Sequence, residues 1–274
     1  MADVRFNHIT FHYGKKCIFE DLSLTVEESQ IMCLVGPSGC GKTTLVRCLL
    51  GFIKPETGSI YVGDRCLFDA EKGIDVSPEH RHIGVVFQDY AVWPHMTVAE
   101  NVVIGSEPVR GVFFDRKKAE AQVAAMIDEY NFHISATAKV ETLSVGEQQR
   151  VEILKALYRG ADLLILDEPT AVLTPQEVED LFRVMRQLKA AGKSIIIITH
   201  KLKETMEIAD RVSVLRQGKM IESGVPVAGT TMNELAQMMV GRDVELSVTR
   251  RAEQVGEENF SVRGLSLTER GVPL

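Results

Sequence analysis

The sequence contains one stretch whose residue types and spacing suit the binding of phosphate. Residues 36–43 read Gly-Pro-Ser-Gly-Cys-Gly-Lys-Thr, which fits the pattern G-x-x-x-x-G-K-S/T. Glycines let backbone N–H groups approach phosphate oxygens without a side-chain clash, and a following helix directs its N-terminal dipole at the same place. We expect Lys42 to neutralise the outer phosphates and the Thr43 hydroxyl to ligate Mg²⁺. The alternative is a glycine-rich turn before an ordinary helix.

The segments around this loop favour the first of these interpretations. An apolar run at residues 31–35 precedes the loop, and a helix-compatible run at residues 44–50 follows it and ends at Gly51. A strand, a glycine-rich loop and a helix in this order are the context that the motif requires. The sequence therefore predicts phosphate binding by Gly36, Pro37, Ser38, Gly39, Cys40, Gly41, Lys42, Thr43 and Thr44.

Two acidic residues stand at the end of another apolar run, residues 163–166. A short, wholly apolar run is typical of a strand buried on both faces of a parallel sheet. We expect Asp167 to hold Mg²⁺ there, and Glu168 to orient or deprotonate an attacking water. The alternative of an N-cap acid beside a solvated neighbour stays open, because acids are common at strand ends.

A helix start at residues 143–150, Leu-Ser-Val-Gly-Glu-Gln-Gln-Arg, is a second place suited to an anion. Ser144 and the N–H groups beside Gly146 would form another anion-binding helix terminus. A plain serine N-cap is the alternative. A single γ-phosphate would be bound by two such helix starts only if the second one came from another subunit.

These segments together resemble the ATP-binding cassette (ABC) ATPases, whose common signature motif is L-S-G-G-Q, along about residues 3–240. The resemblance implies ATP and Mg²⁺ as cofactors, and two cassettes that close head-to-tail on two ATP molecules. It implies that the signature residues Ser144, Gly146 and Glu147 contact the nucleotide of the other cassette.

The resemblance also gives roles to three residues that the motifs above do not include. Gln88 would contact Mg²⁺ and water, His200 would contact the γ-phosphate, and Tyr13 would stack on adenine. Each of them is otherwise an ordinary residue at the end of a predicted strand. The implied catalytic set is Lys42, Gln88, Glu168 and His200, and the implied metal ligands are Thr43, Gln88 and Asp167.

Some positions depart from the common family pattern. The signature motif has Val145 for glycine and Glu147 for glutamine, and Thr174 stands where the common form has aspartate. These departures and residues 141–225 resemble sugar and nucleoside importer ATPases. Residues 81–98 and the phosphate loop resemble ATPases of iron, polyamine or sulfate importers instead. The sequence therefore predicts a mosaic of two subfamilies, with a join near residues 95–105.

The remaining sequence predicts an α/β fold. Strands are predicted at residues 3–27, 59–62, 83–87, 163–166 and 195–199, and helices at residues 115–130 and 146–158 and after a capping box at Thr174. Their alternation favours a parallel sheet. The resemblance specifies a P-loop NTPase (RecA-like) core, an N-terminal antiparallel β subdomain and a helical subdomain inserted at about residues 89–158. Residues 69–82 are predicted to be a loop.

We predict one nucleotide-binding domain at residues 1–242 and a separate tail at residues 243–274. Within the tail, residues 258–267 resemble the opening strand of a second cassette and weakly echo residues 3–11. This predicts a truncated or split two-cassette protein with a loosely packed tail.

The composition limits the classes of partner. A formal charge of −7 and a pI of about 5.6 give no basic footprint for nucleic acid. The most apolar runs are far too short to span a bilayer, so a membrane link must come through a partner.

The aromatic segment with Tyr90, Val92, Trp93 and Met96 predicts either permease docking or ordinary core packing. The five cysteines form no C-x-x-C pair, which is typical of reduced thiols.

The predicted function is the ATP-hydrolysing subunit of an ABC transporter, an importer of sugar or nucleoside type. The implied partners are permease subunits, a second ABC ATPase domain and a substrate-binding protein, with no nucleic acid. The implied location is the cytoplasmic face of the cell membrane, as a peripheral subunit. Two alternatives stay open: an importer of iron, polyamine or sulfate type, and a soluble non-transport ABC ATPase. A chromosome- or repair-type ATPase is disfavoured because no sustained heptads are present.

Overall fold

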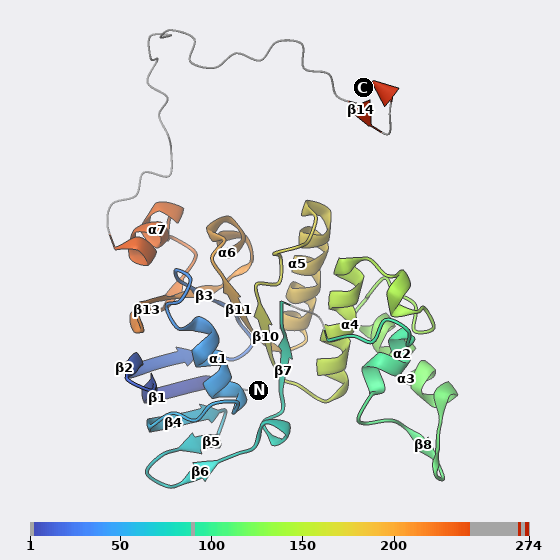
Figure 1. Ribbon diagram of the computed structural model, residues 1–274, viewed down its shortest axis with the longest axis horizontal. Coiled ribbons are helices and arrows are strands. Elements are labelled where there is room, and N and C mark those ends of the chain that lie inside the picture. Colours follow the sequence, from blue (N-terminus) through green and yellow to red (C-terminus); the bar gives the residue numbers. More distant parts are fainter. Residues whose placement is uncertain (1–2, 89–90, 242–267, 270–271, 274) are drawn as a thin grey trace. The chain divides into compact units, whose positions relative to one another are not determined.

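The computed structural model describes residues 3–88, 91–241, 268–269 and 272–273 (Figure 1). The chain divides into two units, Met1–Val244 and Glu245–Leu274. In the second unit, β14 (Thr268–Glu269) and β15 (Val272–Pro273) pair as short antiparallel strands. The predicted likeness of residues 258–267 to a second cassette lies outside the described residues, so it stays a prediction.

A sheet at the centre of the first unit holds the segments with the predicted chemistry. Its strands lie in the order β13 (Lys219–Pro226), β12 (Arg211–Arg216), β3 (Ile31–Val35), β11 (Ser194–Thr199), β10 (Leu163–Asp167) and β7 (Ile83–Val86). All neighbours are parallel except β12 and β13. The predicted α/β fold with a parallel sheet is confirmed.

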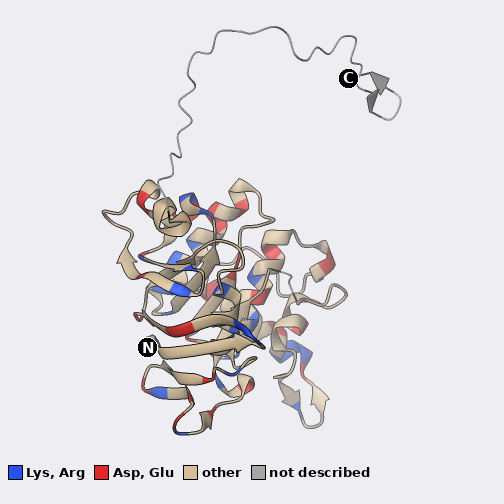
Figure 2. Ribbon diagram, turned by 60° about the vertical axis from the view of Figure 1, so that its left-hand side comes forward, with Lys and Arg blue, Asp and Glu red and all other residues tan. Residues whose placement is uncertain are grey.

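This sheet is buried on both faces because β3 is apolar at every position, and β10 and β11 are apolar at all but their end residues. Ile31, Cys33 and Val35 of β3 join one apolar cluster, whereas Met32 and Leu34 join the other. Side chains alternate between the two faces of a strand, so a continuous apolar run fits only a sheet covered on both sides. Figure 2 shows most of the charged residues outside the centre of this sheet, and the charged residues of β10 and β12 lie at the ends of those strands.

A second, antiparallel sheet covers one side of the core. Its order is β2 (Lys16–Val26), β1 (Val4–Tyr13), β4 (Thr57–Val62), β5 (Arg65–Asp69) and β6 (Ile74–Asp75). The predicted strands at residues 3–27 are thus confirmed. The predicted loop at residues 69–82 is wrong in part, because it contains β6 and a short 3₁₀ turn, Pro78–His80. Backbone pairing to β5 makes β6 a strand despite its polar surroundings.

Four helices follow strands of the central sheet. They are α1 (Lys42–Leu50), α5 (Pro175–Ala190), α6 (Leu202–Ile208) and α7 (Met232–Val240). Helix α1 lies between the two sheets in Figure 1, and its apolar residues join the cluster that both sheets share. Helix α5 begins with the predicted capping box, in which the side chains of Thr174 and Glu177 each accept from the backbone N–H of the other residue.

A group of helices forms the predicted insertion. It contains α2 (Val98–Val103), α3 (Arg116–Glu129) and α4 (Val145–Tyr158). Asp115 is the N-cap of α3, as predicted, and its side chain accepts from the Lys118 N–H. The structure adds a hairpin that the sequence did not predict, β8 (Val109–Arg110) with β9 (Phe113–Phe114). It stands away from the helices at the lower right of Figure 1.

A buried arginine joins the phosphate-loop helix to the antiparallel subdomain. The guanidinium of Arg81 donates to the carbonyls of Cys48 and Leu49 at 2.9 and 2.7 Å, to the carbonyl of Val76 at 2.7 Å, and to Asp75 at 3.2 Å. The last carbonyls of a helix have no intrahelical partner. Arg81 therefore supplies the donors that the buried end of α1 lacks.

Replacing Arg81 by alanine is expected to lower the free energy of unfolding by about 3 kcal/mol, because buried acceptors lose their donor. Urea denaturation measures this loss. The matched control is Arg116→Ala, since Arg116 is exposed and, among the described residues, pairs with Glu100 and Glu120 alone. That control should change stability by less than about 0.5 kcal/mol. Equal unfolding midpoints for both variants would contradict the capping role.

Candidate functional site: a phosphate-binding loop at the edge of the parallel sheet

The loop at residues 36–43 joins β3 to α1 and needs glycine at two close approaches. A side chain at Gly36 would collide with the backbone carbonyl oxygen of Leu215, and one at Gly41 would lie 2.5 Å from the Phe19 ring. Gly41 is also the N-cap of α1, with a φ of 113°, and it provides no side-chain cap. The N–H groups of the first turn of α1 are therefore open to an anion.

Lys42 lies in this loop with its ammonium held by backbone oxygens. Its Nζ donates to the carbonyls of Gly36 at 2.6 Å and Pro37 at 3.1 Å, and the residue is 8% exposed. A nearly buried ammonium needs acceptors or a counter-charge. Phosphate oxygens would provide a stronger counter-charge at the same place.

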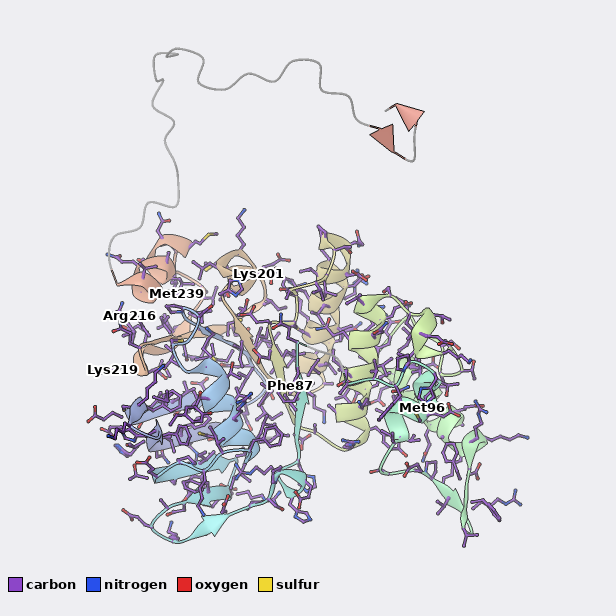
Figure 3. The ribbon with its side chains drawn as sticks, in the orientation of Figure 1. Phe87, Met96, Lys201, Arg216, Lys219 and Met239 are labelled. Atoms are coloured by element: carbon purple, nitrogen blue, oxygen red, sulfur yellow. The ribbon has the colours of Figure 1, made fainter. Side chains whose placement is uncertain are left out.

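Two cavities adjoin the loop. One, of about 270 Å³, is lined by Tyr13, Lys16, Ile18, Gly39, Gly41, Lys42, Thr43 and Thr44. The structure thus brings Tyr13 beside the loop; this residue is 46% exposed, and its ring lies edge-on to that of Phe11. The other, of about 410 Å³, is lined by Pro37, Ser38, Gly39, Cys40, Arg216, Gln217, Met239 and Val240. Figure 3 labels Arg216 and Met239, two of the residues that line this second cavity.

The strand register places the other predicted residues at the same edge of the sheet. Thr199 pairs with Val35, and Asp167 pairs with Ile198, so His200, Gly36 and Glu168 leave their strands side by side. Gln88 leaves the same edge two residues after β7 and is exposed. Parallel strands present their carboxyl ends at one edge, which is where open α/β sheets bind ligands.

Glu168 is held against His200. Its Oε1 lies 2.8 Å from His200 Nδ1, while its buried Oε2 has no hydrogen-bond partner in the described part of the chain. The backbone of Glu168 has a φ of 48°, a conformation that non-glycine residues adopt rarely. A buried polar oxygen without a partner is unusual in folded proteins.

The adjacent carboxylate, Asp167, is more basic than usual. Burial is the main reason that its pKa is raised, and the charge of Glu168 adds to this shift. The charges of Lys42 and Arg47 act in the opposite direction on the pKa of Asp167. A divalent cation would relieve the repulsion between the two acids.

The described residues at this edge do not form a metal site by themselves. Among the residues that the structure describes, no three His, Cys, Asp or Glu side chains are grouped to hold a metal. Mg²⁺ is commonly bound by one or two protein groups together with substrate phosphates. The predicted ligands Thr43, Asp167 and Gln88 fit that mode, because they would act with the phosphates of a nucleotide.

The predicted signature segment forms the start of α4. Ser144 is the N-cap: its Oγ accepts from the Glu147 N–H, and its own N–H donates to Glu147 Oε2 at 2.8 Å. The carboxylate of Glu147 is thus part of a capping box. Within the described chain, no hydrogen bond joins residues 144–147 to the phosphate loop. This helix start would have to serve a different nucleotide from that of its own loop.

Comparison with known sequences decides the family. The profile of the family described as ABC transporter matches residues 19–171, which is more than half of the chain. The chain belongs to the ABC transporter family. The predicted resemblance to the ABC ATPases is confirmed.

The ABC relatives include transport proteins of bacteria. The chain is 44% identical to the guanosine import ATP-binding protein NupO of Bacillus subtilis, over 92% of this chain and 49% of that protein. It is 37% identical to the nucleoside import ATP-binding protein NupA of Lactococcus lactis, over 95% and 51% respectively. The chain spans about half the length of these curated relatives.

Solved ABC structures share the fold. The ADP form of MJ1267, an ATP-binding cassette of an ABC transporter, superposes with a TM-score of 0.74 at 23% identity, covering 88% of this chain and all of that one. The predicted P-loop NTPase fold class is confirmed.

The ABC cassette contains polar contacts that the sequence did not predict. Lys201, which follows His200, donates to the carbonyl of Thr170 at 2.8 Å and lies 3.1 Å from Glu204 (Figure 3). Thr170 Oγ1 in turn bonds Glu204. The only sequence signal was the position of Lys201 beside a predicted site residue. These contacts fasten the loop after Glu168 to the segment that carries His200.

Thiol modification of Cys40 is expected to block ATP binding, and bound ATP should protect the thiol. Cys40 is buried, and its Sγ lies 3.9 Å from Lys42 Nζ, so an added group would displace the loop. Burial raises the pKa of Cys33 and of Cys48 to about 12, which leaves them unreactive. Mass spectrometry after maleimide treatment identifies the labelled thiols.

The control for this labelling is Cys17→Ser, because Cys17 is exposed and should react first. That variant should lose the fast labelling but keep the protection by ATP. Full ATP affinity in protein labelled at Cys40 would contradict the prediction.

Proposed function

We propose that this chain is the ATP-binding and ATP-hydrolysing cassette of an importer of sugar or nucleoside type. The observation that carries the proposal is the shared edge at which Lys42, Glu168 and His200 meet. The import proteins that the chain resembles are named for guanosine, nucleosides, ribose and glucose, which supports this cargo class.

The proposed mechanism uses residues of the phosphate loop and of the neighbouring strand ends. Lys42 exchanges the carbonyls of Gly36 and Pro37 for the β- and γ-phosphates of ATP, and Tyr13 stacks on adenine beside the loop. Glu168 Oε2 accepts a proton from the water that attacks the γ-phosphorus, and ADP leaves. His200 holds Glu168 Oε1 in place and contacts the γ-phosphate. Mg²⁺, bound by Thr43, Asp167 and Gln88, would neutralise phosphate charge.

The proposed assembly contains two cassettes. Ser144 and Gly146 of one cassette would complete the site formed by the phosphate loop of the other, because no hydrogen bond within the described chain joins them to their own loop. Permease subunits and a substrate-binding protein are the further partners that we propose, at the cytoplasmic face of the cell membrane. No helix in the described ranges has the length and apolar character needed to cross a membrane.

A surface segment supports the proposed contact with a permease. Trp93 is 52% exposed, whereas Val92 and Met96 are partly buried, and Tyr90 lies outside the described residues. The buried side chain of Asn101 accepts from the Trp93 N–H at 2.7 Å and donates to its carbonyl at 3.0 Å. An exposed indole on a fixed backbone is suited to docking.

Glu168→Gln is expected to retain ATP binding and to lower kcat for ATP hydrolysis about 10³-fold, because an amide cannot accept the proton. Phosphate release and ATP affinity are measured on the same preparation. The matched control is Glu179→Gln, an exposed glutamate on α5, which should hydrolyse ATP normally. Full turnover by the Glu168 variant would remove this residue as the base.

Trp93→Ala is expected to weaken co-purification with the permease subunits and to leave basal ATP hydrolysis unchanged. The control is Phe52→Ala, since Phe52 is equally exposed but lies after α1, outside the proposed docking segment. Loss of nucleotide binding in the Trp93 variant would show that its side chain has a packing role instead.

A further inference from the structure

A carboxylate from α5 lies in the anion-binding start of α4. Glu177 Oε1 accepts from the Ser144 hydroxyl at 3.0 Å and from the Gly146 N–H at 3.2 Å. The contact is close, since a Cβ on Gly146 would lie 2.9 Å from the same oxygen. The two donors that a γ-phosphate would use on the signature helix are therefore already bonded within the chain.

Glu177 is bound on both of its oxygens. Its Oε2 accepts from the N–H and the hydroxyl of Thr174, both at 3.0 Å. The Thr174 backbone N–H lowers the pKa of Glu177 most, and the hydroxyls of Ser144 and Thr174 and the Gly146 N–H lower it further. Glu177 is therefore an anion at neutral pH.

The Ser144 hydroxyl cannot donate to Glu177 and to a phosphate at the same time. Its hydroxyl has one proton, which it donates to Glu177, while the same oxygen accepts from the Glu147 N–H. The Ser144 hydroxyl could therefore donate to a phosphate oxygen only if its hydrogen bond to Glu177 were broken. Two anions on the same donors would also repel each other.

We propose that Glu177 is an internal competitor for the ATP held by the opposite cassette. It keeps the signature donors occupied until the phosphates displace it, and so sets the ATP concentration at which two cassettes close. Ser144 and Val145 are exposed, so an opposite cassette can reach the site. The proposal rests on the proposed function, because it needs a second cassette to bring ATP.

Another residue of this chain has the same local role without the second contact. Glu234 forms a capping box with Thr231 at the start of α7, and its Oε2 accepts from the N–H and hydroxyl of Thr231 at 2.7 and 2.9 Å. Glu234→Gln therefore removes a capping charge from a helix start without emptying an anion site. It is the matched control for Glu177→Gln.

The experiment compares Glu177→Gln with Glu234→Gln. Each change is made in the full chain that also carries Glu168→Gln, which prevents ATP turnover. Light scattering measures the ATP concentration that gives half-maximal dimer. Glu177→Gln should lower it about fivefold, a typical size for the coupling between two ligands at one site. A second measurement, binding of fluorescent ATP to dilute monomer, should be unchanged because Glu177 does not touch the phosphate loop. Thermal melting checks that both variants are folded.

Each outcome has a definite meaning. A lower ATP threshold for Glu177→Gln than for Glu234→Gln supports the competition. An equal or higher threshold overturns it and leaves Glu177 as a purely structural cap. If the parent chain binds ATP but does not dimerise at any ATP concentration, the proposed two-cassette function fails, and this inference fails with it.

Discussion

The parallel register of β3, β11 and β10 aligns the ends of three strands, and the whole proposed ATP site depends on that alignment. Each strand continues directly into a segment with different chemistry: the phosphate loop, His200 and the pair Asp167–Glu168. The register is strongly specified, because a slip of one residue would exchange the side chains that face the two apolar clusters. The packing of aliphatic residues thus fixes the positions of the charged ones.

Several polar groups at this edge are bonded to one another. Lys42 bonds the loop carbonyls, Glu168 bonds His200, and Lys201 bonds Thr170. Each of these contacts satisfies a buried or half-buried polar group, which is costly to leave unpaired. A nucleotide must therefore exchange contacts rather than simply add them, so affinity depends on how much stronger the new contacts are.

The sequence predicted best those features that local patterns determine. Apolar runs identified the inner strands, and Thr174 and Asp115 were recognisable as caps because the cap and its partner are three residues apart. The hairpin β8–β9 was missed since its strands have only two residues each. The contacts of Glu177 with Ser144 span 33 residues and depend on how α4 packs beside α5. No local pattern contains that information.

The helix starts of this cassette differ in a way that would give ATP binding an order in the proposed two-cassette assembly. Helix α1 begins at Gly41 without a side-chain cap, so its N–H groups are available to phosphates at once. Helix α4 begins with Ser144, whose hydroxyl and neighbouring N–H are taken by Glu177. ATP should therefore occupy the loop of one cassette first. The opposite α4 can follow only when the phosphates, fixed by that loop, offer its donors a better anion than the one they hold.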